Sequence, residues 1–273
     1  MVLLHLSDLH FGTDQADVRD ALCRLVHRAA PDIAVLTGDI TQRARQAQFR
    51  AAEEFLRALR LPAFVAVPGN HDIPLFNVLS RVGEPYRNYC AVFGAELDPV
   101  FVSDAMLLLC VNTTRWYRHK NGEISQQQIE QVAEQLVGAR ADQVRIVAMH
   151  HPVLAIRMKD EANLLRGGTR AVTVWAEAGV DLILGGHIHL PYVRPLHHSI
   201  QNLARRVWTI QAGTGVSWRT RDGIPNSVNI IRRATSSSPL QCGIERWDYA
   251  AAAGEFQQIE MDTLYLDEAR TAR

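Results

Sequence analysis

Two histidines separated by one residue, His187 and His189, follow an apolar segment of the sequence. That segment, residues 181–186, ends in two glycines, which predicts a buried strand whose backbone then passes close to another part of the chain. Side chains at i and i+2 share one face of an extended or turning backbone, so both imidazoles can point at one place. The spacing suits a metal centre.

Four upstream segments show the same pattern, an apolar strand followed by side chains that can bind a metal. The apolar segments are residues 2–6, 33–37, 64–67 and 144–149. The polar side chains that follow them are Asp8, His10, Asp39, Asn70, His71, Asp72, His150 and His151. Each one alone could be an ordinary turn residue. Because ligands of α/β sheets bind beyond the carboxyl ends of the strands, clusters at five strand ends predict one shared site.

The donors expected at this site are carboxylate, amide and imidazole groups, with no thiolate. Such a set favours Mn, Fe, Zn or Co over a closed structural zinc site. Seven donors exceed the need of one ion, so we expect two divalent metal ions, with a carboxylate such as Asp39 bridging them. The seven residues are Asp8, His10, Asp39, Asn70, His150, His187 and His189.

Helical patterns lie between the predicted strands. One helix is expected to begin at a cap, Thr13 or Asp14, and to end before Pro31. A second is expected from about 43 to 59, and Ser125 with Gln128 forms a predicted capping box for a third. Alternating strands and helices predict parallel strand pairs joined by right-handed crossovers.

The rest of the chain is less regular. Residues 73–100 contain several prolines and aromatic residues, and we expect either a helical lid over the site or a helical flank beside it. Segments within 205–262 read as successive strands that complete a second sheet. Together these elements predict a single domain over residues 1–273.

Composition narrows the class of protein. A hydrophobic content of 47% in 273 residues supports a large core, and 29 basic residues balance 29 acidic ones. The chain therefore carries no net positive charge that would attract it to nucleic acid or to an anionic membrane. No apolar run approaches the roughly 20 residues of a membrane span, and the first residues show no secretion signal. Four widely spaced cysteines read as reduced thiols, so we expect a cytoplasmic protein.

The polar blocks resemble, in order and spacing, the five signature blocks of the calcineurin-like metallophosphoesterase superfamily. The matching stretches are Asp8-x-His10, Gly38-Asp39, Gly69-Asn70-His71-Asp72, Met149-His150-His151-Pro152 and Gly186-His187-x-His189. The resemblance spans about two-thirds of the chain, Asp8 to His189. It implies an α/β fold in which two mixed β-sheets pack as a sandwich flanked by helices.

The resemblance also implies roles for individual residues. The first ion would be held by Asp8, His10, Asp39 and His189, and the second by Asp39, Asn70, His150 and His187. His71 would be a catalytic histidine that binds no metal and protonates the departing oxygen, with Asp72 orienting it. His151, Arg43 and His119 are candidates for contacts with the substrate.

The expected function is an enzyme, a metal-dependent phosphodiesterase acting on small-molecule phosphodiesters. Cyclic nucleotides such as cyclic AMP come first, because length and the Asn-His-Asp block resemble bacterial class III cyclic-nucleotide phosphodiesterases. The Ser-Asp-Leu-His form of the first block departs from the Asp-Thr-His form common in those enzymes. A phosphomonoesterase, a pyrophosphatase and a nuclease stay open, although balanced charge disfavours nucleic acid. A non-catalytic scaffold is disfavoured because all seven ligands are retained, and the oligomeric state stays open, a dimer included.

Overall fold

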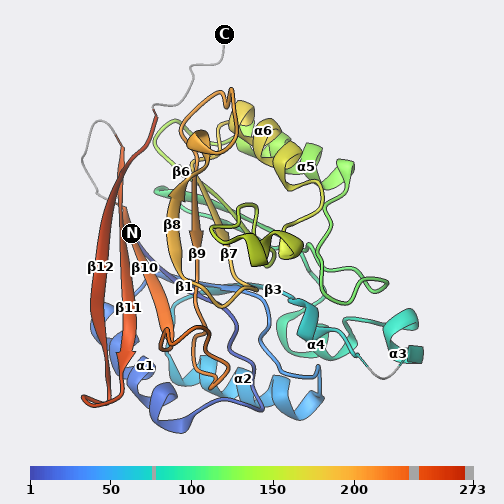
Figure 1. The fold of residues 1–273 in the computed structure, drawn as a ribbon, viewed down its shortest axis with the longest axis vertical. Coiled ribbons are helices and arrows are strands. Elements are labelled where there is room, and N and C mark those ends of the chain that lie inside the picture. The colour runs from blue at the N-terminus through green and yellow to red at the C-terminus, as the bar shows by residue number, and fades with distance from the viewer. Residues whose placement is uncertain (76–77, 234–239, 268–273) are drawn as a thin grey trace.

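Two six-stranded mixed sheets face each other in the computed structural model, which describes residues 1–75, 78–233 and 240–267 (Figure 1). The first sheet has the order β12-β11-β10-β1-β2-β3. Its strands are β1 (Val2–Leu6), β2 (Ile33–Thr37), β3 (Phe64–Val67), β10 (Ser227–Arg233), β11 (Gln241–Ala250) and β12 (Glu255–Tyr265). The second has the order β4-β5-β6-β7-β9-β8. Its strands are β4 (Val100–Val102), β5 (Met106–Val111), β6 (Val144–Met149), β7 (Leu182–Gly185), β8 (Tyr192–Pro195) and β9 (Trp208–Gln211).

Helices cover the outer face of each sheet. Against the first sheet lie α1 (Ala16–Ala29) and α2 (Gln46–Ala58), and against the second lie α5 (Gln126–Val137) and α6 (Gly168–Ala178). The remaining helices are α3 (Val78–Gly83), α4 (Arg87–Phe93) and the short 3-10 turns η1 (Asn70–Asp72), η2 (Met158–Asn163) and η3 (Leu196–His198). The predicted sandwich of two mixed sheets between helices is confirmed.

Alternate residues of the central strands build separate layers of the core. In β1, Leu4 and Leu6 pack toward the helices, while Leu3 packs between the sheets. From the second sheet, Ile146 and Leu184 join the same inter-sheet layer. β2, β5 and β6 are buried along their whole length because both of their faces are covered.

The strands of residues 205–262 divide between the two sheets. The prediction that they complete one second sheet is wrong in this respect: β9 pairs with β7, whereas β10 pairs antiparallel with β1 and carries β11 and β12 with it. The short strands β4 and β8 were not predicted. Each is an edge strand of only three or four residues, too short for a clear periodic pattern.

The predicted cap of α1 is also wrong. Gln15 occupies the cap position and makes no side-chain cap. Thr13 instead hydrogen-bonds His10 O at 2.8 Å, and Asp14 accepts from Gly12 N at 2.9 Å. These polar side chains hold the loop that carries His10. The capping box of Ser125 and Gln128 at α5 is present as predicted.

The helical segment within 73–100 packs on the flank of the first sheet's helices. Tyr89 of α4 is buried, donates to Ala66 O at 2.8 Å and meets the ring of Phe49 of α2 edge-on. Residues 76 and 77 of the predicted lid or flank lie outside the described residues. In the described chain no helix has the length and apolar character needed to cross a membrane.

Candidate metal centre

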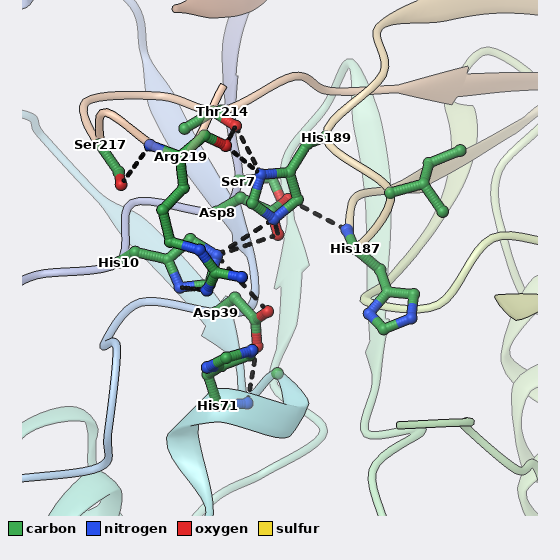
Figure 2. A network of polar contacts seen from close by, with 12 residues as sticks. Ser7, Asp8, His10, Asp39, His71, His187, His189, Thr214, Ser217 and Arg219 are labelled. Carbon is green, nitrogen blue, oxygen red and sulfur yellow. Dashed lines mark hydrogen bonds and ion pairs between the residues drawn. The ribbon is translucent and has the colours of Figure 1, made fainter. Parts of the chain in front are cut away.

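The loops after β1, β2, β3, β6 and β7 meet at one edge of the two sheets, as the five clusters of polar residues predicted. Figure 2 shows Asp8, His10, Asp39 and His189 pointing toward one another from three of these loops. Ligand atoms of these four residues all lie within 4.8 Å of one another. His150, His151 and His187 form a second group by the same measure.

The first group is tightly packed and shielded from solvent. His189 Nε2 lies 3.3 Å from Asp8 Oδ1 and 3.2 Å from His10 Nε2. His10 Nε2 lies 3.7 Å from Asp39 Oδ2. The side chains of Asp8 and His10 are fully buried. Two imidazole nitrogens and two carboxylate oxygens therefore converge on one point.

Asp39, a member of the first group, also lies close to the second. His150 Nε2 lies 3.4 Å from Asp39 Oδ1, 3.2 Å from Asn70 Oδ1 and 3.2 Å from His187 Nδ1. Asp39 thus turns one oxygen toward each group. This is the arrangement expected of a carboxylate that bridges two ions.

The proton positions of two imidazoles test whether cations fit here. His189 Nδ1 lies 2.6 Å from Arg219 O, and His150 Nδ1 lies 2.7 Å from Thr37 O. A carbonyl oxygen only accepts, so both Nδ1 atoms carry a hydrogen, and in the neutral form of each ring the lone pair of Nε2 faces a carboxylate. Two such electron-rich atoms repel each other unless a proton or a metal ion lies between them. Asp8 Oδ1 is buried with no hydrogen-bond partner among the described residues, which fits the same explanation.

The electrostatics of the site also favour a bound cation. Burial lowers the pKa of His150, but the charge and hydrogen bond of Asp39, with the charge of Asp8 and the hydrogen bond to Thr37 O, together outweigh burial and raise the pKa to about 9. Burial lowers the pKa of His187 to about 3, since no carboxylate compensates it to the same extent. The carboxylates Asp8 and Asp39 therefore attract a cation, whether a proton or a metal ion.

The backbone is held in an unusual conformation at these residues. Of the ten non-glycine residues with positive φ in the described chain, five are Asp8, His10, Asp39, His187 and His189. Positive φ is uncommon for residues with a side chain, and it concentrates where function requires a fixed geometry. The sharp turns aim side chains from separate loops at one place.

Two glycines allow the loops to approach closely. A Cβ at Gly186 would lie 1.8 Å from Ser7 Oγ, and one at Gly69 would lie 2.1 Å from Asp39 N. Any side chain would force the loops apart. The prediction that the backbone passes close to another segment after β7 is confirmed at Gly186.

His71 stands at the rim of this centre without joining either group. Its Nδ1 donates to Gln42 O at 3.0 Å, and its ring lies edge-on to His10 with 4.9 Å between centroids. Its backbone N–H donates to Asp39 Oδ1 at 2.8 Å. Nε2 is then the nitrogen left for a ligand.

Asp72 does not orient His71 in the way the family resemblance implied. Its carboxylate accepts hydrogen bonds from the backbone N–H groups of Ile40, Thr41 and Gly69. Burial raises its pKa to about 6, with the nearby charge of Asp39 adding to the effect. Asp72 therefore ties the loop after β2 to the loop after β3, and Gln42 orients His71.

A cavity of about 520 Å³ opens beside the centre. Its lining includes Asp39, Asn70, His71, His119, Lys120, His187, His189, Trp218 and Arg219. Of the three predicted substrate contacts, His119 lines this cavity. Arg43 lines a neighbouring cavity with Arg45 and Arg87 instead.

His151 is buried behind the cavity wall. Its Nδ1 lies 2.8 Å from Thr113 Oγ1 and its Nε2 lies 3.2 Å from Lys120 O. Both ring nitrogens are thus occupied, and the ring holds the 113–123 loop in place. This placement does not support a direct contact with substrate.

Three residues near the site were not among the predicted site residues: Gln42, Thr214 and Arg219. Gln42 accepts from His71 and, through its side chain, from Arg219 Nη1 at 2.9 Å. Thr214 Oγ1 lies 2.8 Å from His189 Nδ1. The contact between Gln42 O and His71 uses a backbone carbonyl, which leaves no signal in residue type. The position of Gln42, in the loop after a strand that ends in a ligand, was the available hint.

Comparison with known proteins agrees with this geometry. A family model described as calcineurin-like phosphoesterase matches residues 1–191. A cAMP/cGMP dual specificity phosphodiesterase of Mycobacterium tuberculosis is 30% identical over 210 residues, covering 69% of this chain and 61% of that protein. The glycerophosphodiester phosphodiesterase GpdQ of Enterobacter lignolyticus is 29% identical over 171 residues, covering 57% and 58%.

A third relative is also named as a phosphodiesterase. The 3',5'-cyclic adenosine monophosphate phosphodiesterase CpdA of Escherichia coli K12 is 28% identical over 167 residues, covering 60% of this chain and 56% of that protein. The matches span 56% to 61% of the length of these three curated relatives.

Solved structures share the fold. A dimetal phosphatase of Danio rerio superposes with a TM-score of 0.67 at 12% identity, covering 98% of this chain and 99% of the other. Purple acid phosphatase PPD1 from yellow lupin superposes with a TM-score of 0.72 at 11% identity, covering 97% and 53%.

Proposed function

Because this chain belongs to the calcineurin-like phosphoesterase family, we propose that it is a metal-dependent phosphodiesterase that hydrolyses small-molecule phosphodiesters. The observation that carries the proposal is the position of Asp39. Its two oxygens face separate groups of imidazoles, at 3.4 Å from His150 and 3.7 Å from His10. A hydrolase of phosphoester bonds is also what the names of the three curated relatives describe.

The residues present fit two divalent ions. Asp8, His10, Asp39 and His189 would hold the first ion, and Asp39, Asn70, His150 and His187 the second. When bound, such a pair lowers the pKa of a water molecule toward neutrality and offsets the negative charge of a phosphoryl group. Mn, Fe, Zn and Co all accept these donors, so cellular supply decides among them.

The chain's own residues would provide the proton for the leaving group. Because Gln42 O accepts from His71 Nδ1, a protonated His71 presents its second N–H, at Nε2, to the cavity. It would give that proton to the departing oxygen. Arg219, 2.9 Å from Gln42 Oε1 and 3.4 Å from His10 Nδ1, places a further positive charge beside the centre.

Two substrate classes follow from the relatives. Cyclic nucleotides are the first, because the M. tuberculosis and E. coli proteins carry that activity in their names. Glycerophosphodiesters are the second, on the evidence of GpdQ. A cavity of about 520 Å³ can hold either, since small-molecule sites typically measure about 300–1,000 Å³.

The test is a pair of chromogenic substrates. The protein is stripped with chelator, resupplied with Mn and assayed on bis-p-nitrophenyl phosphate and on p-nitrophenyl phosphate. We expect faster turnover of the diester, and no activity before the metal is restored. A reversed ranking would support a phosphomonoesterase, and no activity on either ester with Mn, Fe, Zn or Co would contradict a phosphoesterase altogether.

A further inference from the structure

Trp218 is an exposed aromatic residue at the edge of the metal centre. It lies in the loop between β9 and β10, beyond the 1–191 stretch that the family model matches. The residues just before it, 211–217, are all buried, yet its own side chain is 63% exposed. The side chain lines the same cavity as Asp39, His71 and His189.

The backbone around Trp218 is fixed on both sides. Trp218 N donates to Thr13 O at 3.1 Å, and Ser217 O accepts from Asn226 Nδ2 at 2.7 Å. Arg219 O accepts from His189 Nδ1 at 2.6 Å, and Figure 2 shows Ser217 and Arg219 beside that histidine. The exposure of the indole is therefore not the result of a loosely held loop.

An exposed indole on a fixed backbone is suited to stacking. It offers a large flat surface, and little conformational freedom is lost when a ring packs on it. Among the described residues no aromatic ring contact to Trp218 is found. Its face is thus left for a ligand that enters the cavity.

Other cavity residues favour an anionic ligand with a flat group. Lys120 and Arg219 add positive charge to the lining, and His119 adds another flat polar ring. A phosphodiester bound at the metal centre would have its substituents within this lining. A nucleobase could stack on an indole, whereas a glycerol group has no π face to offer.

We propose that Trp218 stacks on the base of a nucleotide phosphodiester and so determines specificity for nucleotides over aliphatic glycerophosphodiesters. The inference rests on the proposed phosphodiesterase function and narrows its substrate class. Trp218 touches the base and not the phosphorus, so it acts on binding and not on the chemical step.

The experiment compares variants on two substrates. Wild type, Trp218→Ala and Trp218→Phe, each loaded with Mn, are assayed on cyclic AMP and on glycerophosphoethanolamine. Base stacking on an aromatic side chain predicts a rise of about five- to one-hundredfold in KM for cyclic AMP in Trp218→Ala, with kcat little changed. Trp218→Phe should recover most of the affinity, and glycerophosphoethanolamine kinetics should stay within about twofold of wild type.

Trp116→Ala is the matched control. Trp116 is also exposed, at 45%, but it packs on Tyr117 and is not among the residues that line the cavity. Its replacement should leave KM for cyclic AMP unchanged. A similar rise in KM in Trp116→Ala would mean that loss of any exposed indole raises KM for cyclic AMP, and that the effect is not specific to Trp218.

Other outcomes separate failure of the inference from failure of the proposed function. An equal loss of kcat/KM on both substrates in Trp218→Ala would show that the residue only supports the loop that holds His189. An unchanged KM for cyclic AMP in the same variant would show that the indole does not stack on the base. A wild type that cleaves glycerophosphoethanolamine but not cyclic AMP would also overturn the inference while leaving a phosphodiesterase. A wild type that cleaves no phosphodiester would reject the proposed function itself. If the wild type cleaves only cyclic AMP, the KM values of Trp218→Ala and Trp218→Phe for cyclic AMP still decide whether the indole stacks on the base.

Discussion

The backbone carbonyl of Arg219 lies 2.6 Å from Nδ1 of His189. Arg219 follows β9, whereas His189 follows β7, so a later loop fixes the ring of a candidate metal ligand supplied by an earlier one. Thr214 Oγ1 adds a second contact, 2.8 Å from His189 Nδ1 and 3.0 Å from Arg219 O. Partners of this kind orient metal-binding imidazoles and tune their affinity.

Thr214→Val is expected to weaken metal binding without removing a ligand. Valine keeps the shape of the buried side chain but loses the hydroxyl that supports His189 and Arg219. We expect about a tenfold to hundredfold loss of affinity for one of the two ions, measured by competition with a metallochromic chelator. Thr173→Val in α6 is the control, since the Thr173 hydroxyl donates to the helix carbonyl Thr169 O and lies outside the metal centre. Equal affinities in wild type and Thr214→Val would show that the carbonyl alone orients His189.

Asp39→Asn is expected to lose both ions. Asparagine offers one oxygen and no charge, and its NH₂ group would face one of the two groups of imidazoles that Asp39 Oδ1 and Oδ2 now serve. Metal content by inductively coupled plasma mass spectrometry should fall to near zero. Asp104→Asn, a surface carboxylate whose side chain is 97% exposed, should retain the wild-type content. If Asp39→Asn keeps one tightly bound ion, Asp39 does not bridge.

His71→Ala is expected to keep the metals and to lose turnover. His71 belongs to neither group of ligands, and its ring is held by Gln42 O. Loss of a general acid predicts a fall of about 10² or more in kcat with little change in metal content. His27→Ala, a helix histidine that meets Ala58 O, serves as control. A His71→Ala enzyme as fast as wild type would remove the proposed acid.

His5 is expected to make the protein sensitive to acid. Its Nδ1 faces the Asn229 amide at 3.3 Å and its Nε2 faces Thr37 Oγ1 at 3.0 Å, and burial lowers its pKa from 6.5 to about 3. In the unfolded chain His5 binds a proton below pH 6.5, whereas in the folded chain its buried ring stays neutral until the pH approaches 3. The stability that His5 contributes is therefore present above pH 6.5 and is lost as pH falls toward 3, by about 1.4 kcal/mol per pH unit.

The measurement is urea unfolding of wild type and His5→Gln between pH 7 and pH 4. Glutamine can still bond Thr37 but does not titrate, so its free energy of unfolding should rise relative to wild type as pH falls. His198 is exposed, so the free energy of unfolding of His198→Gln should follow that of wild type across this pH range. Parallel pH profiles for wild type and His5→Gln would contradict the buried neutral imidazole.

Residue types and periodicity predicted most of the strands and the clustering of the polar residues. β1, β2, β3 and β6 begin and end where the apolar segments do, and Asp8, Asp39 and His189 converge as expected. These features depend on side chains that the sequence displays directly.

What the sequence did not reveal depends on contacts between distant segments. The pairing of β10 with β1 cannot be read from strand pattern, since a buried strand looks alike in either sheet. Thr13 is a good helix cap by type, but its hydroxyl serves His10 O and Ser217 instead. Asp72 bonds backbone N–H groups of two loops, which no spacing rule identifies.

The centre draws on both sheets: Asp8, Asp39 and Asn70 follow strands of the first, whereas His150 and His189 follow strands of the second. The spacing between the two halves of the candidate ligand set is therefore set by the thickness of the apolar layer between the sheets, where Ile146 and Leu184 pack. Truncation or enlargement of those side chains would alter that spacing from a distance. In a deep mutational scan for activity, buried aliphatic positions remote from the cavity would rank among the intolerant ones, even where the variants remain folded.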